Sequence, residues 1–223
     1  MADPTGATDR TAFTRKPDRG SHDLADARAV LAEALIGHVG TVEDGGGPVV
    51  LPVAIALDPD ADRVLFHGST GAGMFRRLAA GAPACLTVTH LDGLVIARSA
   101  FESSMNYRSV VVLGTCEVLD GQAKRDALRV ITDHLTPGRW DAARPLRSSE
   151  VAATLVLALP LAEFSVKSRD GGPNDDEDAG WPIWAGHIPV RMVAGQPIPA
   201  DASTAHPRPQ VPSCLEGPEV PRR

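Results

Sequence analysis

The chain has 223 residues, a hydrophobic fraction of 43% and a formal net charge of −6, which suits one well-cored domain. This acidic balance argues against nucleic acid as a partner, because neutralising phosphates requires a clustered basic face. No run approaches the roughly 20 apolar residues that a membrane-spanning helix requires. The three cysteines form no CxxC pair, and the polar start has no secretory h-region. We therefore expect a cytoplasmic protein with buried thiols and no membrane span.

Composition divides the chain into three parts. Residues 1–22 are interrupted by prolines and glycines and are predicted to form an extended arm. Residues 23–195 carry periodic apolar patterns and are predicted to form the folded domain. Residues 196–223 are Pro-rich, and we expect this tail to be disordered.

The first half of the domain reads as one helix followed by a β-meander. Asp23 precedes apolar residues at helical spacing, which predicts a helix through Leu35. Segments 37–43 and 48–57 flank a Gly-rich turn and predict a hairpin, and a turn rich in Asp and Pro separates them from a strand at 63–67. These connections are too short for crossover helices, so the strands must be antiparallel.

The second half mixes strands with short helices. Asp92-Gly93 predicts a tight turn between strands at 84–90 and 94–99, and Gly114 predicts a bend in a long strand. The remaining expected elements are a helix at 74–80, the long strand at 108–119, a helix at 124–135, a helix-then-strand segment at 151–159, and strands at 162–167 and 186–192. Several short antiparallel strands with few helices predict a mainly β protein, a closed or nearly closed β-barrel with peripheral helices.

The segment from His67 to Gly73 is the first candidate for a binding loop. Its glycines allow close approach of the backbone to a ligand, and Ser69 and Thr70 offer hydroxyl donors. The loop leads into a helix N-terminus, which favours anions, and Arg76 lies one turn further on. An ordinary strand-to-helix turn with a capping Ser explains the pattern equally well. No Lys follows the glycines, so a P-loop is excluded.

The segment from Ser104 to Val110 is the second candidate. Arg108 can bind a phosphate with two donors, and Asn106 or Tyr107 can meet a ring edge or ribityl hydroxyls. Taken alone, a loop with one surface Arg explains it better. Two such segments beside strands of one small sheet favour a cofactor site.

Tryptophans and histidines give weaker signals. Trp181 and Trp184 stand in a chain with only 4% aromatic residues, where packing is favoured for the first and stacking on a flat ligand for the second. His38 flanks a strand and fits an ordinary hydrogen-bonding role. Without an HExxH motif or a His/Asp cluster, the sequence predicts no metal site.

In their order along the chain, these motifs resemble the flavin-nucleotide-binding family of the pyridoxamine 5'-phosphate oxidase-like superfamily, especially its nitroimidazole-resistance branch. The resemblance extends over roughly residues 15 to 190. The matching pieces are RKPDRGSHD (15–23), HVG (38–40), VLP (50–52), LFHGS (65–69), NYRSVVVLG (106–114), HLTPGRW (134–140) and PIWAG (182–186).

The resemblance implies an FMN-binding split β-barrel that forms a homodimer with two flavin sites at the subunit interface. It also implies roles for particular residues. Ser69 and Thr70 would meet the phosphate side, with charge from Arg76. The other implied flavin contacts are Val50, Leu51, Pro52 and Val53 beside the isoalloxazine ring, His67 near the flavin, Arg108 with Ser109 in the anion pocket, and Trp184 from the C-terminal segment.

The function predicted on this basis is an FMN-dependent oxidoreductase acting on an unknown small molecule. The cofactor carries such chemistry, and the protein positions it. His67, whose unperturbed pKa lies near neutrality, and Tyr107 are the predicted catalytic residues. The alternative is a non-catalytic protein that binds or stores flavin, deazaflavin or haem on the same barrel, with His67 or His38 as the haem ligand. A barrel that has lost its ligand is a third possibility.

Overall fold

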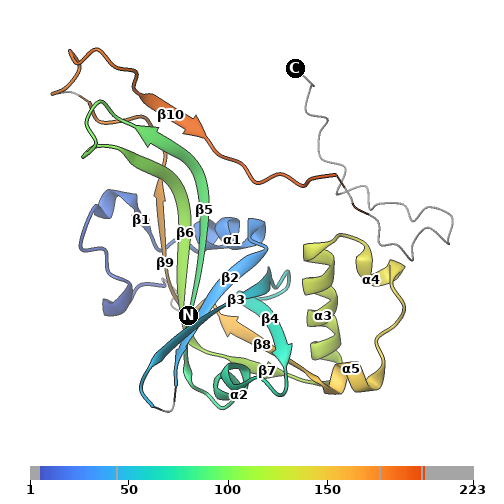
Figure 1. The fold of residues 1–223 in the computed structure, drawn as a ribbon. Helices are drawn as coiled ribbons and strands as arrows, with labels where there is room; N and C mark the ends of the chain where they lie inside the picture. Colours follow the sequence, from blue (N-terminus) through green and yellow to red (C-terminus); the bar gives the residue numbers. More distant parts are fainter. Residues whose placement is uncertain (1–5, 44, 176, 197, 199–223) are drawn as a thin grey trace.

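The structure is a computed structural model that describes residues 6–43, 45–175, 177–196 and 198 (Figure 1). The described residues form a mainly β fold. Its strands are β1 (Gly20–Ser21), β2 (Ile36–Val42), β3 (Pro48–Leu57), β4 (Arg63–Ser69), β5 (Pro83–Ile96), β6 (Ser104–Thr115), β7 (Glu117–Leu119), β8 (Thr154–Pro160), β9 (Glu163–Arg169) and β10 (Gly186–Pro189). Its helices are η1 (Asp9–Thr11), η2 (Pro17–Arg19), α1 (Leu24–Glu33), α2 (Gly73–Ala79), α3 (Gly121–Leu135), α4 (Arg139–Ala142) and α5 (Ser148–Ala152).

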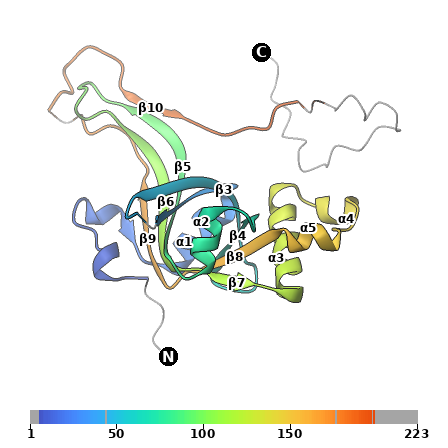
Figure 2. The same ribbon diagram turned by 60° about the horizontal axis from the view of Figure 1, so that its bottom comes forward.

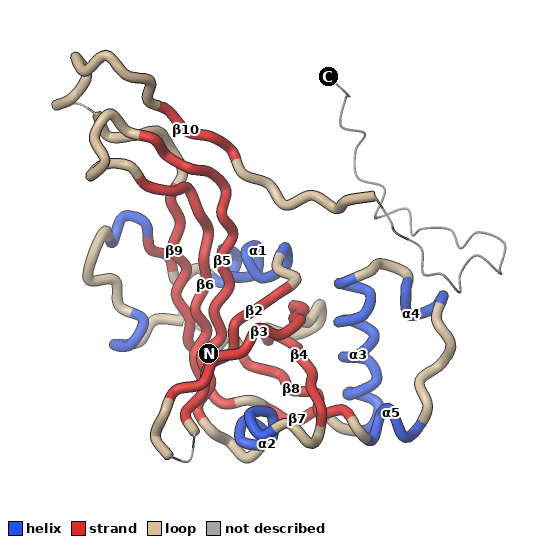
Figure 3. The backbone as a smooth tube through the Cα atoms, in the orientation of Figure 1, coloured by secondary structure: helices blue, strands red, loops and turns tan. Residues whose placement is uncertain are grey.

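The described strands form one antiparallel sheet in the order β1-β9-β6-β5-β2-β3-β4-β8-β7, with β10 added to β5. β6 pairs with β5 and β9, yet β7, which begins two residues after β6 ends, pairs with β8 at the other end of this order. The sheet must therefore curl until its ends approach, as the strands in Figure 3 do. The bend at Gly114 that the sequence predicts lies at this junction, and the predicted barrel with peripheral helices is confirmed.

Two apolar clusters hold the described fold together. The larger lies inside the barrel and includes Phe66, Leu86 and Phe164, together with Leu31 from α1 and Leu78 from α2. The smaller lies between the outside of the β4–β8 region and α3. Its members are Ala56, Leu65, Leu119, Ala127, Leu128, Ile131, Val156 and Ala158. Figures 1 and 2 both show α3, α4 and α5 gathered at this end of the molecule.

β5 and β6 continue beyond the barrel as a long arm, with β10 alongside β5 (Figure 1). The predicted tight turn at Asp92-Gly93 is wrong, because β5 runs unbroken from Pro83 to Ile96 and only shifts register between Leu91 and Gly93. The Asp-Gly pair forms a β-bulge there. A Cβ at Gly93 would lie 3.1 Å from the carbonyl oxygen of Ile188, so the glycine lets β10 approach closely.

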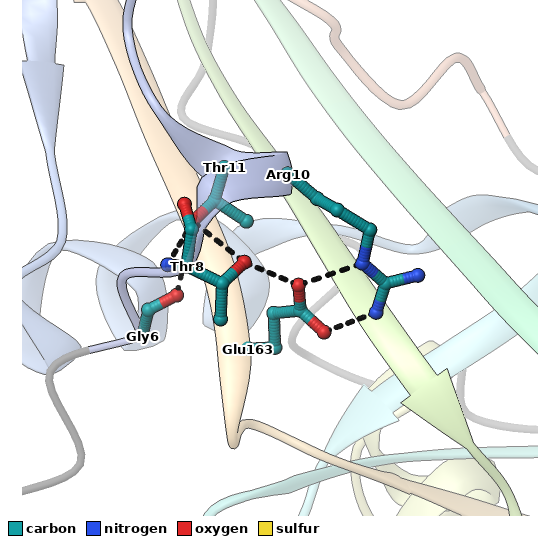
Figure 4. Close-up of polar contacts among 5 residues, drawn as sticks. All are labelled: Gly6, Thr8, Arg10, Thr11 and Glu163. Carbon is teal, nitrogen blue, oxygen red and sulfur yellow. Dashed lines mark hydrogen bonds and ion pairs between the residues drawn. The ribbon is translucent and has the colours of Figure 1, made fainter.

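The described part of the N-terminal segment is not the extended arm that the sequence predicts. Residues 6–22 form η1, η2 and β1, and β1 pairs with β9. The backbone N–H of Phe164 donates to the carbonyl of Gly6, and Arg10 and Thr8 both bond to the Glu163 carboxylate (Figure 4). The segment is therefore tied to β9. Of the predicted tail at 196–223, only residues 196 and 198 lie within the described part.

In the described part of the chain, no helix combines the length and apolar character needed to cross a membrane. The same residues contain no group of three or more His, Cys, Asp or Glu side chains placed to hold a metal ion.

Candidate functional site

An exposed strand edge forms the first part of the candidate site. β3 pairs with β2 from Pro48 to Ala54, but with β4 only from Ile55 to Leu57. Among the described strands, none pairs with residues 50–53 on the side facing away from β2. Because successive residues of an antiparallel strand direct their backbone groups to alternate sides, some of these N–H and C=O groups are free to meet a ligand. Leu51 and Pro52 are exposed here and so accessible to a ligand, and their position beside a flat ring stays a prediction.

The end of β4 and the loop that follows form the second part. Ser69 and Thr70 are exposed, and the Oγ of Ser69 accepts a hydrogen bond from the backbone N–H of Gly71 at 3.1 Å. The hydroxyl hydrogen of Ser69 thus remains available to an anion. The backbone N–H of Thr70 donates to Ala153 at 3.0 Å and fixes the loop against α5. Arg76 on α2 is also exposed, so the predicted phosphate-side residues lie on one connected segment.

The loop is held in place by close packing between β4 and α2. A Cβ at Gly68 would lie 2.5 Å from the ring of Phe75, so the glycine is what allows the helix to lie against the strand. We expect Gly68→Ala to lower the free energy of unfolding by about 1–3 kcal/mol, the usual cost of overpacking, in urea denaturation. Gly71→Ala is the matched control, because a Cβ there meets its nearest neighbour at 3.6 Å. Equal stability of the two variants would contradict this account.

His67 lies on β4, one residue before Gly68, and pairs across the sheet with Val156. Strand alternation places it on the same face as Leu65, which packs beneath α3. Although the side chain is exposed at the surface, desolvation by the surrounding protein lowers the pKa of His67. The imidazole is therefore neutral at pH 7 and can accept a proton, which its predicted catalytic role would require.

Arg108, the predicted phosphate ligand, is occupied by carboxylates. Its Nε and Nη2 donate to the two oxygens of Asp92 at 3.0 and 2.9 Å, and its Nη1 donates to Glu33 at 2.8 Å. These bonds raise the pKa of Arg108 and lower those of Asp92 and Glu33. The arrangement links α1, the β5 bulge and β6, and its excess negative charge does not favour a phosphate.

The lowered pKa values of Asp92 and Glu33 predict acid-sensitive stability. Both folded-state values lie below the unfolded values of about 4, so the stabilisation is present at neutral pH and is lost as the pH falls through the folded-state values. Since both side chains are at least one-third exposed, we expect Arg108→Gln to cost only about 1 kcal/mol at pH 7. In urea titrations this difference should shrink by pH 3.5. Arg125→Gln, on the exposed side of α3, is the control. If Arg108→Gln lost the same free energy of unfolding at pH 7 and pH 3.5, the assignment would be contradicted.

Two of the other predicted residues of β6, Asn106 and Ser109, already form hydrogen bonds within the chain. Asn106 is buried; its Nδ2 donates to Gly171 at 3.1 Å and its Oδ1 accepts from Arg169. Ser109 donates to the carbonyl of Lys167 at 3.1 Å, and Tyr107 is half-buried beside these residues. Arg169 could not be predicted as the partner of Asn106, because the two residues lie 63 positions apart and no local pattern links them.

Trp184 and Trp181 both lie at the surface, 62% and 64% exposed. A Cβ at Gly186 would lie 2.8 Å from the Trp184 indole, so this ring rests on the glycine at the start of β10. Neither indole is packed into the described chain. The stacking role of Trp184 stays a prediction, as does interface packing by Trp181.

Apart from His38 and Trp184, the predicted residues fall into two groups that lie apart in one chain. The first group lies on β3, β4 and α2, and the second on β6. In the sheet order β6-β5-β2-β3-β4, the nearest members are separated by two strands, about 14 Å at the usual spacing. A ligand that contacts both groups on one chain would have to reach across these two strands.

The structure also reveals a groove that the sequence did not. Past Gly40, β2 separates from β5, and a cavity of about 540 Å³ opens there. Its wall is largely apolar. His38 of β2 and Arg10 of η1 are also among the lining residues. The apolar lining residues include Val42, Pro48, Val49, Val50, Pro83, Ala84 and Leu113. No local pattern could reveal it, because Arg10 comes from the N-terminal segment, far from these strands in sequence.

A curled antiparallel sheet with an exposed β3 edge is the architecture of a split β-barrel. The family model described as pyridoxamine 5'-phosphate oxidase matches residues 23–168, and the chain belongs to this flavin-binding split-barrel family. Among curated proteins, none has a sequence that matches the chain.

Two solved structures resemble the chain over nearly its whole length. The flavocytochrome Anf3 from Azotobacter vinelandii is 38% identical, with 93% of this chain and 96% of that chain covered and a TM-score of 0.85. An FAD- and haem-binding protein from Mycobacterium smegmatis is 39% identical, with 88% and 97% covered and a TM-score of 0.82. A candidate 5-nitroimidazole resistance protein from Bacteroides thetaiotaomicron is 22% identical, with 65% and 83% covered and a TM-score of 0.55, and shares the fold.

Proposed function

We propose that this chain is a redox protein that binds a flavin and a haem as a homodimer. The observation that carries the proposal is the 38–39% identity to a flavocytochrome and to an FAD- and haem-binding protein over at least 88% of this chain. The second of these proteins binds FAD, which favours FAD over the FMN expected from the sequence. When bound, flavin and haem would supply electron-transfer chemistry.

The flavin would lie along the free edge of β3. Residues 50–53 would offer backbone donors and acceptors to the ring, and the hydroxyls of Ser69 and Thr70 would face its phosphate side. The exposed guanidinium of Arg76 would supply the positive charge there. Arg108 suits this role less, because Asp92 and Glu33 already occupy its guanidinium. His67, neutral at pH 7, would stand beside this site.

The homodimer is supported by an uncovered apolar surface. Pairing places Ile36, Val42 and Val50 on one face of β2 and β3, where they are 57%, 51% and 59% exposed. We call this surface the outer face. Burying it against a second copy would remove apolar area from water, and a two-fold axis would let β6 of one copy approach β3 of the other.

The first experiment is spectroscopic. The purified full chain is scanned for flavin bands and a Soret band, and the released flavin is separated by chromatography to tell FAD from FMN. Flavin and haem each at about one per chain would support the proposal. A protein that rejects added FAD, FMN and haem would overturn it. Oxidation of NADH or NADPH by the loaded protein, with a nitro compound or oxygen as acceptor, would distinguish an oxidoreductase from a binding protein.

A further inference from the structure

The described histidines divide into two sets by their hydrogen bonds. Three have Nε2 within 3.1 Å of a backbone carbonyl oxygen, and in each case the bond fixes the ring in place. They are His22 with Thr11, His90 with Val30 and His134 with Ala34. The other three described histidines, His38, His67 and His187, make no hydrogen bond within the described chain. Iron needs one free ring nitrogen: the second set offers both, and the first set offers only Nδ1, so hydrogen bonding favours the second set and position must decide among its members.

Of these three, His38 alone lines the groove between β2 and β5. It lies on β2 opposite Pro52 of β3 and Thr87 of β5, so strands on both sides hold its backbone. Alternation places its side chain on the outer face, where it is exposed in one chain; a haem bound there would lie between this face and the second copy proposed to cover it. The imidazole therefore projects from a rigid part of the sheet at the wall of the cavity.

The lining of the groove suits a haem. A volume of about 540 Å³ falls within the range of about 300–1,000 Å³ that is typical of small-molecule and cofactor sites. Apart from His38, the wall is mainly aliphatic, which suits a macrocycle. Arg10 adds a cation: its Nε and Nη2 bond to Glu163, and its Nη1 is left without a partner in the described chain. That nitrogen can donate to a carboxylate such as a haem propionate.

The two rival histidines lie elsewhere. His67 is on β4, beyond β3 from the groove, at the proposed flavin site. His187 is on β10, where it pairs with Val95 on the arm outside the barrel. Neither lines the cavity.

We propose that His38 would bind the iron of a haem held in this groove, and that Arg10 would supply a donor to a haem carboxylate. The inference rests on the proposed function, since it names the residue and the surface that would hold the haem. Because Val50 belongs both to the groove and to the free β3 edge, the two cofactors would lie next to each other.

The test uses the full-length protein titrated with ferric haem and then desalted. We measure the haem-to-protein ratio and the Soret band for the wild type, His38→Ala, His67→Ala, His187→Ala and Cys85→Ser. Cys85 lines the same groove, so its variant controls for a general disturbance of the wall. We expect His38→Ala alone to lose retained haem and the wild-type Soret band. Added imidazole should restore the band in that variant, which a merely structural role for His38 would not allow.

The outcomes separate this inference from the proposed function. A wild type that takes up no haem would remove the haem part of the proposed function, and the assignment of His38 would fall with it. A wild type that binds haem while His38→Ala keeps the same spectrum would overturn the assignment alone. Loss of the band in His67→Ala, His187→Ala or Cys85→Ser, with His38→Ala unaffected, would also overturn it. Arg10→Gln should weaken haem retention without moving the Soret band, and an unchanged affinity would remove the role given to Arg10.

Discussion

Replacing Phe66 by alanine should lower the free energy of unfolding by about 3–5 kcal/mol, the usual cost of removing a buried phenyl ring. Phe66 has no exposed surface and lies at the centre of the barrel cluster. Its ring contacts that of Phe75 edge to face, with centroids 6.0 Å apart, and so joins β4 to α2. A typical domain is stable by about 5–15 kcal/mol, so this one change would remove a large share.

The same substitution should also weaken flavin binding, because β4 and α2 carry the loop with Ser69 and Thr70. Urea denaturation measures the free energy of unfolding. A flavin titration without urea, where the variant is still folded, measures the affinity for flavin. Phe101→Ala is the matched control: Phe101 is 89% exposed in the connection between β5 and β6, and its loss should change stability by no more than about 0.5 kcal/mol. A loss under about 1 kcal/mol for Phe66→Ala would show that the barrel cluster has been misassigned.

Local patterns were sufficient to predict most elements of the barrel. Alternation and turn residues place the hairpin of β2 and β3 within one residue of its observed bounds, and the predicted helix-then-strand segment is α5 followed by β8. The prediction failed where a distant contact decides the local conformation. Asp92-Gly93 has the composition of a tight turn, but β10 and Arg108 meet it and hold the chain as a bulged strand.

The candidate site was less predictable for the same reason. The loop after β4 is a contiguous motif, and its exposed hydroxyls and nearby Arg76 could be predicted from the sequence. Arg108 has the same local character as a phosphate ligand, yet its carboxylate partners lie 16 and 75 residues away. The groove depends on Arg10 and on the separation of β2 from β5, which are properties of the packed sheet.

A single charge on the outer face should separate the proposed dimer. Ile36 is 57% exposed on the outer face and lines neither the groove nor the proposed flavin edge, so Ile36→Glu leaves the inside of the barrel and both sites unchanged. In a two-fold assembly, each copy would bury an unpaired carboxylate, and like charges brought together cost several kcal/mol. We expect the dimer dissociation constant to rise at least about a hundredfold, equivalent to about 2.8 kcal/mol. Sedimentation at several concentrations would measure this shift.

Flavin retention should fall together with the dimer if a second copy completes the site. Ala123→Glu adds the same charge on the exposed side of α3 and should change neither assembly nor flavin content. A wild type that is monomeric and still holds one flavin per chain would refute the interface site. An Ile36→Glu protein that remains dimeric would place the interface on another surface. A monomeric variant that keeps its flavin would mean that residues of one chain suffice, which would favour the β3 edge, Ser69 and Arg76 over any contribution from β6 of the partner.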